Sequence, residues 1–339
     1  MHHGRLRFGV LGAAHIVPNA LIKPAQQLTD VTINAIAARD QTRARAFALT
    51  HGIPHVMRTY DEVVGASSID AIYIPLPNSL HCEWAVRALR AGKHVLCEKP
   101  LAANEQEAKR MAQVAEQSGL VLAEALHYRY HPLASRVYEL LHEGAIGRIA
   151  ELECHFSVPA SPKNIRFDWD LAGGVTMDLG CYLLNMIHYF SGCRPRVHQA
   201  AALIGPPNID VTMEVILELE DGATARMSCS MAPDATAEAR FAAKGERGEL
   251  LVTNPVAPHH GHQLTIKTGD TVRRETVEGL TTYTYQLRAF LAAVRGEQPI
   301  ATAGSDGILN MRLIDEVYHA AGMPPRGAVA SHHESPAGA

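Results

Sequence analysis

The first 125 residues alternate short apolar runs with helix-like sequences, and no other feature constrains the fold of this chain as strongly. The apolar runs have the length of strands and occur at residues 6–11, 31–38, 69–75, 93–98 and 120–125, with a shorter segment at 55–60. Strands that are apolar on both sides are typical of parallel sheets with helices on both faces. The alternation therefore predicts that residues 1–125 form an N-terminal α/β Rossmann domain with a doubly wound parallel sheet.

The pattern changes after about Leu126, where most strand-like runs alternate apolar with polar residues. These runs occur at residues 149–158, 197–205, 210–222, 223–231, 238–246, 263–270 and 271–279. Helix-like sequences occur at 132–144, after Gly174, at 285–294 and at 306–321. We therefore expect residues 126–323 to form an α+β domain with a large, mainly antiparallel open sheet, and residues 324–339 to form a flexible tail.

The composition is that of an ordinary globular protein and argues against two classes of partner. The 339 residues are 47% hydrophobic, and a net charge of −4 offers no basic surface to nucleic acid. No apolar run approaches the ~20 residues of a membrane span. Six scattered cysteines without a CxxC pair favour reduced thiols. The short FGVLGAA run leads into a glycine turn, so we interpret it as a strand rather than a signal peptide and expect a cytoplasmic protein.

A glycine turn follows the first strand and matches the dinucleotide-binding fingerprint only in part. No register from Gly9 to Ile16 supplies all three glycines of G-x-G-x-x-G. The small residues of the turn would still let a pyrophosphate approach the backbone closely, although the motif alone is equally compatible with an ordinary strand–helix turn. The residues expected to contact the cofactor here are Gly12, Ala13, Ala14, His15 and Ile16.

The end of the second strand bears on the choice of cofactor. An acidic residue there would hold the 2′-hydroxyl of NAD, whereas an arginine accommodates the 2′-phosphate of NADP. The chain has Arg39 first, and Asp40 is free to cap the next helix. The sequence therefore favours NADP(H) over NAD(H), with a solvent-facing Arg39 as the alternative.

The tripeptide Glu98-Lys99-Pro100 stands at the end of another apolar run. The carboxyl ends of parallel strands face the ligand crevice, and the proline stiffens the turn that follows. Lys99 is therefore well placed to meet a bound nicotinamide or a substrate. A strand-end lysine taken alone is more often a surface charge.

The helix expected after Gly173 and Gly174 has a narrow polar stripe beside its apolar side. At ~100° per residue, this stripe consists of Asp178, Tyr182, Asn185 and Tyr189. A solvated helix edge is the usual interpretation of such a pattern. Few charges decorate this helix, however, and the two glycines permit the close approach of another backbone. The pattern therefore favours buried polar groups that bind a ligand or one another.

The chain resembles the Gfo/Idh/MocA family of oxidoreductases over most of its length. The matching stretches are GVLGAAHI, AARD, IDAIYIPLPNSLHCEWAVRALRAGKHVLCEKPLA, EALHYRYHP and LAGGVTMDLGCYLLN. The GCY tripeptide is similar to the branch with glucose–fructose oxidoreductase, dimeric dihydrodiol dehydrogenase and xylose dehydrogenases. The resemblance implies an NAD(P)-dependent dehydrogenase or reductase that acts on a hydroxyl-bearing carbon of a sugar, polyol or cyclic diol.

The resemblance also implies roles for individual residues. Lys99 is the expected catalytic lysine, and Asp178 and Tyr182 complete the catalytic set. The residues expected to contact the nicotinamide half of the cofactor are Pro75, Leu76, Asn78, His81 and Glu98. Because tyrosine ordinarily has a pKa near ~10, we expect Lys99 to lower the pKa of Tyr182 and to polarise the substrate oxygen. Either Lys99 or Tyr182 could exchange the proton, and Tyr182 is favoured.

Further residues have weaker grounds for a role in the site. The substrate contacts that we consider are Arg129, Trp169 and Asn185, and His127 and His131 follow the domain crossover with Arg129. A hinge role for the crossover residues and a core role for Trp169 are equally compatible with the sequence. The His259-His260-Gly261-His262 segment lies in a proline-containing loop and lacks the i, i+4 spacing of a helical metal site. We therefore expect a solvated loop there and no metal centre.

Two other functions remain open at this stage. A branch of the family cleaves glycosidic bonds with tightly held NAD. Enzymes of that branch resemble the version of the second-helix motif that has histidine, whereas this chain has Tyr182 at that position. A non-catalytic NADP-binding sensor would keep the fold, but the joint presence of Lys99, Asp178 and Tyr182 argues against it.

The second domain combines many strands with few helices, so one face of its sheet lacks a partner within the chain. A broad, half-apolar face is unusual for a monomer, and two-fold dimers are the commonest oligomers. We therefore expect a homodimer or a dimer of dimers, and the resemblance implies pairing through this sheet. The alternative is a monomer whose outward face is polar enough to stay wet.

Overall fold

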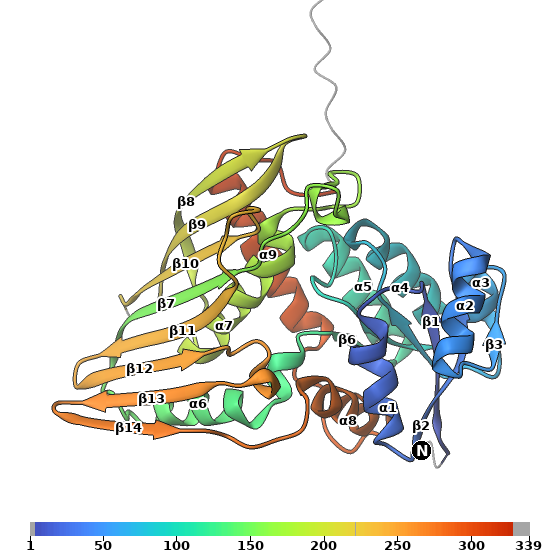
Figure 1. The fold of residues 1–339 in the computed structure, drawn as a ribbon, viewed down its shortest axis with the longest axis horizontal. Helices are drawn as coiled ribbons and strands as arrows, with labels where there is room; N and C mark the ends of the chain where they lie inside the picture. Colours follow the sequence, from blue (N-terminus) through green and yellow to red (C-terminus); the bar gives the residue numbers. More distant parts are fainter. Residues whose placement is uncertain (1–3, 221, 328–339) are drawn as a thin grey trace, which may run out of the picture.

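The computed structural model describes residues 4–220 and 222–327, and its first half is a six-stranded parallel sheet (Figure 1). The strand order is β3-β2-β1-β4-β5-β6, and every pair is parallel. The strands are β1 (Leu6–Leu11), β2 (Val31–Ala37), β3 (His55–Val56), β4 (Ala71–Ile74), β5 (His94–Cys97) and β6 (Leu122–Glu124). The predicted doubly wound sheet is confirmed, and its order reverses at β1 and β4, where such folds bind dinucleotides.

Helices cover both faces of this sheet. They are η1 (Pro18–Ile22), α1 (Lys23–Gln26), α2 (Gln41–His51), α3 (Tyr60–Gly65), η2 (Asn78–Leu80), α4 (His81–Arg90) and α5 (Glu105–Ser118). Successive residues of β2 point into different cores, since Ala35 belongs to one buried cluster and Ile36 to the other. Local sequence fixes the helix ends, because Asn104 caps the first turn of α5 and the left-handed Gly119 ends it, as the sequence predicts.

The second half is an eight-stranded sheet in the order β14-β13-β12-β11-β7-β10-β9-β8. Its strands are β7 (Ile149–Ser157), β8 (Arg196–Gly205), β9 (Ile209–Glu218), β10 (Thr224–Ser230), β11 (Glu238–Gly245), β12 (Gly248–Thr253), β13 (Gln263–Thr268) and β14 (Thr271–Glu275). All described pairs are antiparallel except β7 with β10, so the predicted mainly antiparallel sheet is confirmed. The strand β12 was not predicted, because three consecutive apolar residues, Leu250 to Val252, hide its alternation.

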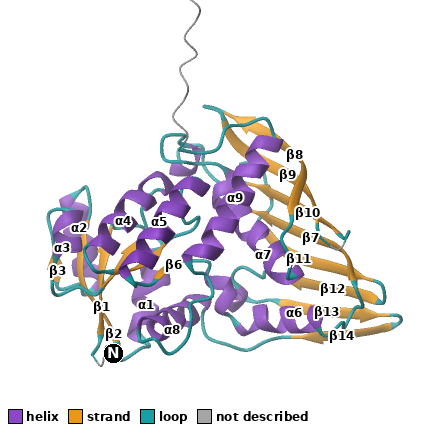
Figure 2. Cartoon of the chain, turned by 180° about the vertical axis from the view of Figure 1, so that it is seen from behind, coloured by secondary structure: helices purple, strands orange, loops and turns teal. Residues whose placement is uncertain are grey.

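The remaining helices lie on one side of the large sheet or between the two halves (Figures 1 and 2). They are η3 (His127–Tyr130), α6 (Pro132–His142), η4 (Ile165–Phe167), η5 (Thr176–Gly180), α7 (Cys181–Ser191), η6 (Pro258–His260), α8 (Thr282–Val294) and α9 (Gly304–Ala320). Although α8 comes late in the chain, its Phe290 packs on Phe8 of β1, with ring centroids 5.7 Å apart. Helix α9 packs against both α5 and β8. The proposed domain limits at residues 125 and 323 stay predictions.

The described start of the predicted tail is anchored in the fold. Arg326 is fully buried and forms an ion pair with Asp210 of β9, while its Nε donates to the carbonyl of Gly173. Residues 324–327 therefore contact both halves, since Asn104 also donates to the carbonyl of Arg326, and the rest of the predicted tail lies outside the described residues. Within the described ranges, no helix is both long and apolar enough to cross a membrane.

Candidate active site

A cavity of about 930 Å³ runs from the carboxyl ends of β1 and β2 to the helical turn η5. Its walls come from both halves of the chain. Among the residues expected from the sequence, those that line it are Gly12, Ala13, Ala14, His15, Ile16, Arg39, Pro75, Leu76, Glu98, Lys99, Asp178 and Tyr182. The fold thus brings most of the expected cofactor and catalytic residues to one continuous space.

The turn after β1 fits the pyrophosphate of a dinucleotide. Gly12 has a φ of +103°, which L side chains rarely adopt, and a Cβ there would lie 3.2 Å from the side chain of Leu76. The adjacent Ala13 and Ala14 add only methyl groups to the wall of the cavity. A pyrophosphate could therefore approach this backbone closely, although the turn has one glycine where the full fingerprint has three.

The end of β2 fits a 2′-phosphate better than a 2′-hydroxyl. The carboxylate of Asp40 accepts hydrogen bonds from the backbone N–H groups of Thr42 and Arg43, so it caps α2 as the sequence allowed. Arg39 is exposed and lines the cavity. Arg43 also lines it and donates to the carbonyl of Ala13 at 2.6 Å. Two guanidinium groups thus line this end of the cavity, and the Asp40 carboxylate that also lines it is engaged in capping α2.

The strand ends around β4 and β5 form the next part of the wall. Glu98 accepts a hydrogen bond of 2.6 Å from the hydroxyl of Tyr73, and burial raises the pKa of the Glu98 carboxyl above its ordinary value. Asn78 and His81, in contrast, are occupied elsewhere. Asn78 donates to the carbonyl of Ala172, and the fully buried His81 bridges the carbonyls of Leu76 and Pro100. These two residues brace the wall rather than present polar atoms to the cavity.

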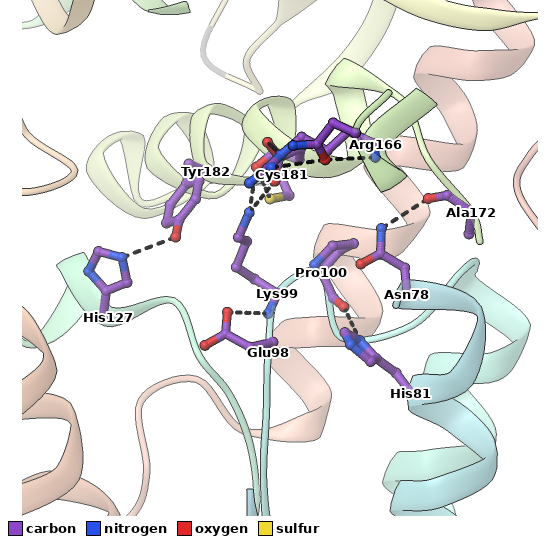
Figure 3. A network of polar contacts seen from close by, with 12 residues as sticks. Asn78, His81, Glu98, Lys99, Pro100, His127, Arg166, Ala172, Cys181 and Tyr182 are labelled. Atoms are coloured by element: carbon purple, nitrogen blue, oxygen red, sulfur yellow. Dashed lines mark hydrogen bonds and ion pairs between the residues drawn. The ribbon is translucent and has the colours of Figure 1, made fainter. Parts of the chain in front are cut away.

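The cluster of predicted catalytic residues centres on the ion pair between Lys99 and Asp178. The Lys99 ammonium lies 2.8 Å from Asp178 Oδ1 and also donates to the Asp178 backbone carbonyl at 2.7 Å. Arg166, from η4, pairs with the other carboxylate oxygen. Figure 3 shows Lys99 rising from the end of β5 toward Arg166 and the first turn of the helix that carries Tyr182. One carboxylate therefore holds two cations at the cavity wall.

The charges of this cluster stabilise one another. Burial disfavours the Lys99 ammonium, but the Asp178 carboxylate outweighs burial and raises the pKa of Lys99. Burial likewise disfavours the Asp178 carboxylate, but Lys99 and Arg166 outweigh it and lower the pKa of Asp178. Lys99 and Asp178 are therefore both ionised near neutral pH.

Tyr182 lies beside the ion pair but is not hydrogen-bonded to it. The Lys99 ammonium lies over the Tyr182 ring, 5.0 Å from its centroid, while the hydroxyl meets Nε2 of His127 at 3.1 Å (Figure 3). Burial raises the pKa of Tyr182 well above its ordinary value. The expectation that Lys99 lowers this pKa is wrong for this arrangement, because the ammonium is directed at Asp178.

Comparison with known proteins assigns the family. The sequence model described as the oxidoreductase family with an NAD-binding Rossmann fold matches residues 6–126, and that of the GFO/IDH/MocA C-terminal domain matches residues 134–251. The chain belongs to the Gfo/Idh/MocA family. The predicted family, fold class and nicotinamide-dependent oxidoreductase activity are confirmed.

Relatives and solved structures of this Gfo/Idh/MocA member match two thirds of the chain or more. D-xylose 1-dehydrogenase (NADP(+)) 2 of Haloferax volcanii is 36% identical over 318 residues, which cover 93% of this chain and 97% of the relative. Trans-1,2-dihydrobenzene-1,2-diol dehydrogenase of Mus musculus is 31% identical over 230 residues, 67% of this chain and 68% of the relative. KijD10, a 3-ketoreductase from Actinomadura kijaniata in complex with NADP and TDP-benzene, superposes with a TM-score of 0.87 at 28% identity, covering 94% and 98% of the chains.

Three tentative substrate residues of this Gfo/Idh/MocA chain do not reach the cavity. Arg129 pairs with Asp306 and stacks on the ring of Tyr189, with its guanidinium 3.7 Å from the centroid. Asn185 donates to the same Asp306 and accepts from Arg129. Trp169 covers the guanidinium of Arg326 at 4.2 Å. Each side chain is held by a partner on another element, so the tentative substrate role is corrected to a structural one.

The histidine-rich segment is packed rather than freely solvated. Burial lowers the pKa of His259 to about 4, and Nδ1 of His259 meets the hydroxyl of Thr282 at 3.3 Å. His262 accepts from the backbone N–H of Val277 at 3.0 Å, and its other ring nitrogen meets the carbonyl of Pro258. Among the described residues, no group of three or more His, Cys, Asp or Glu side chains is arranged to hold a metal ion. The loop therefore supports the site wall.

The structure also adds residues that sequence reasoning did not assign to the site. Arg166 joins the catalytic cluster, and Arg43 joins the cofactor end. Further apolar residues that line the cavity are Phe156, Val158, Met231, Val256 and Tyr283. The signal that could have revealed Arg166 is its position shortly before Gly173 and Gly174. Nothing local marks the wall residues, because they meet only when the large sheet is assembled.

Proposed function

We propose that this protein is an NADP(H)-dependent oxidoreductase that transfers a hydride between nicotinamide and a hydroxyl-bearing carbon of a sugar, polyol or cyclic diol. The observation that carries the proposal is the single cavity that joins Arg39 and Arg43 at one end to Lys99, Asp178 and Tyr182 at the other. When bound, NADP(H) supplies the hydride chemistry at the catalytic end. The relative named for NADP, the xylose dehydrogenase, and KijD10 bound to NADP support this choice of cofactor.

The residues of the chain supply binding and proton chemistry. We assign Asp178 to hold the Lys99 ammonium at the cavity wall, where that cation can polarise a substrate oxygen. We assign Tyr182 to exchange the hydroxyl proton, because its phenol lines the same cavity and remains protonated near neutral pH. Arg166 forms an ion pair with the second oxygen of Asp178, so the carboxylate charge is shared between two cations. The Lys99 ammonium therefore remains able to polarise the substrate oxygen.

The substrate class follows from the walls and from the relatives. The cavity that holds Lys99 and Tyr182 is also lined by Phe156, Met231 and Tyr283, which suit the faces of a sugar or cyclic diol ring. The relatives include a D-xylose dehydrogenase, a dihydrobenzenediol dehydrogenase and a ketoreductase bound to a TDP compound. These names support a carbohydrate-like ring substrate rather than an open-chain acid.

A nicotinamide-fluorescence screen tests the proposal. Purified protein with NADP is mixed with aldoses, inositols, cyclic diols and nucleotide-linked sugars, and formation of the reduced cofactor is followed. Net reduction with any member supports a dehydrogenase. Release of a cleaved sugar without net reduction would instead indicate a hydrolase, and cofactor binding without turnover of any member would indicate a sensor.

Arg39→Ala is expected to weaken NADP binding about ten- to hundredfold and to leave NAD binding nearly unchanged. The physical reason is the loss of a charge-assisted hydrogen bond to the 2′-phosphate, typically worth about 1.5–3 kcal/mol. Fluorescence titration of both cofactors measures the change. Arg45→Ala is the matched control, because Arg45 is an exposed arginine of α2 that does not line the cavity. Equal affinities for NAD and NADP in the unaltered protein would contradict the prediction.

We also propose that the chain forms a homodimer or a dimer of dimers through the outer face of the large sheet. The centre of that face is polar, since Glu151 pairs with both Arg226 and Lys244. Large apolar side chains are exposed toward its ends, including Leu203 (63%) and Leu251 (38%). Exposed apolar side chains on a broad sheet face are unusual for a monomer, and a two-fold dimer would cover them.

Light scattering is expected to give a mass of two or four times the 36.8 kDa of one chain. Leu251→Glu places a charge on the face and is expected to shift the mass toward the monomer. Leu49→Glu is the control, because Leu49 is 88% exposed on α2 of the other half. A mass of one chain that does not change on concentration would refute the proposal.

We further propose a cytoplasmic location. All six cysteines are free in the structure, and five of them are buried. Reduced, unpaired thiols are typical of proteins that work in a reducing compartment. Fractionation of the native host cells tests this location directly.

A further inference from the structure

The hydrogen bond between Tyr182 and His127 is the observation that the proposed mechanism leaves unused. The Tyr182 hydroxyl lies 3.1 Å from Nε2 of His127, and both side chains line the cavity (Figure 3). His127 is only 4% exposed. The Lys99 ammonium bonds to Asp178, so His127 rather than Lys99 is the observed polar partner of the Tyr182 oxygen.

The surroundings of His127 decide which ring nitrogen carries the proton. Nδ1 is buried without a hydrogen-bond partner among the described residues. The imidazole is held by the ring of Tyr283, with centroids 4.2 Å apart, and by the edge of Tyr182 at 5.6 Å. Buried N–H groups without an acceptor are rarer in proteins than acceptors without a donor. The proton therefore belongs on Nε2, where it can be donated to the Tyr182 oxygen.

We propose that His127 is a positioning residue that donates its Nε2–H to the Tyr182 oxygen, leaving the Tyr182 O–H directed at the substrate oxygen. This inference rests on the proposed oxidoreductase function and assigns the proton exchange to Tyr182 rather than to Lys99. With Nε2 as donor, the phenol cannot donate to His127, and its proton is free for the ligand in the cavity.

The charge state of His127 supports this role. Burial, with smaller contributions from His259 and Lys99, lowers the pKa of His127 to about 3, so the ring is neutral near neutral pH. A neutral imidazole presents one fixed N–H without a competing positive charge. The titratable groups around the ring are Lys99 at the end of β5, Tyr182 on α7, His259 on η6 and Tyr283 on α8.

The proton balance is simple in both directions. In reduction, the carbonyl carbon gains a hydride from NADPH, and its oxygen gains the O–H proton of Tyr182. The resulting phenolate is stabilised by the hydrogen bond from His127 Nε2, and it regains its proton from solvent after product release. In oxidation, Tyr182 must first lose its proton to solvent, and the phenolate then takes the carbinol proton while the hydride leaves to NADP. His127 keeps its own proton throughout.

Nitrogen-15 NMR of labelled protein tests the tautomer without any substrate. The spectrum of a His127→Gln variant identifies the His127 signals by subtraction. The expected result is the Nε2–H tautomer at neutral pH, with and without NADP. An Nδ1–H tautomer, or a charged ring at neutral pH, would overturn the proposal. Because no turnover is required, this measurement stands even if the sugar screen fails and the proposed function falls.

Kinetics then tests the consequence. His127→Phe is expected to lower kcat about 10- to 100-fold with NADP affinity unchanged, because the phenolate loses its hydrogen-bond donor. The rise of oxidation kcat with pH should also move to higher pH. His127→Gln keeps an N–H donor of similar reach and should recover most of the loss. His319→Phe is the control, because His319 is an exposed histidine of α9.

A double variant separates this role from a merely structural one. In a Tyr182→Phe background, His127→Phe should lower the residual kcat no further, since the oxygen that His127 serves is gone. An equal loss in both backgrounds would overturn the proposal, as would a His127→Phe enzyme with unchanged kcat and pH profile. If His127→Phe fails to fold, the tautomer and the His127→Gln kinetics still decide the question.

Discussion

Lys99→Met is expected to lower kcat at least about 100-fold, and Tyr182→Phe is expected to do the same. The first change removes the cation that polarises the substrate oxygen, and the second removes the hydroxyl that exchanges its proton. NADP affinity should largely remain, because Arg39 and Arg43 bind at the other end of the cavity. Steady-state kinetics and cofactor titration measure the two effects separately.

The double variant Lys99→Met/Tyr182→Phe should be little worse than the slower single variant, because the two groups act on one proton transfer. The matched control is Lys109→Met, since Lys109 is an exposed lysine of α5 that forms an ion pair with Glu105 on the same helix and does not line the cavity. Losses that multiply, or near-normal turnover in Tyr182→Phe, would show that the pair is wrongly assigned. A Lys99 variant that loses NADP binding in proportion to kcat would move Lys99 to the cofactor site.

The features that sequence reasoning predicted depend on local chemistry. The strands of the parallel sheet were evident because β4 is buried at every residue, which leaves a continuous apolar run. The position of Lys99 followed from the end of such a strand. Asp178 and Tyr182 lie one helical turn apart, so their spacing alone predicts that both side chains face the same way. In the structure both line the cavity.

The features that it missed depend on partners distant in sequence. Arg129 and Asn185 have the polarity of substrate ligands, but Asp306, from α9, binds both. His81 has the chemistry of a cofactor contact, but backbone carbonyls of Leu76 and Pro100 occupy both ring nitrogens. No local pattern reveals which carbonyl or carboxylate a folded chain will bring to a given side chain.

The direction of the Lys99 ammonium is a second example of this limit. A lysine near a tyrosine lowers the tyrosine pKa only where its charge faces the phenol oxygen. Here Asp178 and its backbone carbonyl draw the ammonium over the Tyr182 ring, and His127 takes the position beside the oxygen. Residue types and spacing predicted the members of the cluster but not the hydrogen bonds between them.

Arg326→Met is expected to lower the free energy of unfolding by about 3–5 kcal/mol, because it leaves the buried carboxylate of Asp210 without its cation. Both side chains of this ion pair are fully buried. Asp210 also accepts from the backbone N–H of Thr176 at 2.8 Å and from the hydroxyl of Tyr318 at 3.1 Å. Chemical denaturation measures the loss.

The control is Arg58→Met, which breaks an exposed ion pair with Glu62 in the first half of the chain and should cost no more than about 1 kcal/mol. Equal losses of unfolding free energy in the two variants would show that the buried ion pair stabilises the fold no more than an exposed one. Adding Asp210→Asn to Arg326→Met should restore part of the stability, since the amide still accepts from Thr176 and no unpaired charge remains.

The same ion pair connects the end of the described chain to the catalytic helix. Arg326 donates to the carbonyl of Gly173, and Asp210 holds the first turn of η5, which carries Asp178. Arg326→Met should therefore loosen the segment that directs Asp178 at Lys99. Trp169 lies 4.2 Å from the Arg326 guanidinium, so tryptophan fluorescence should change in Arg326→Met before global unfolding begins. Unaltered fluorescence together with full stability would show that residues 324–327 do not anchor this segment.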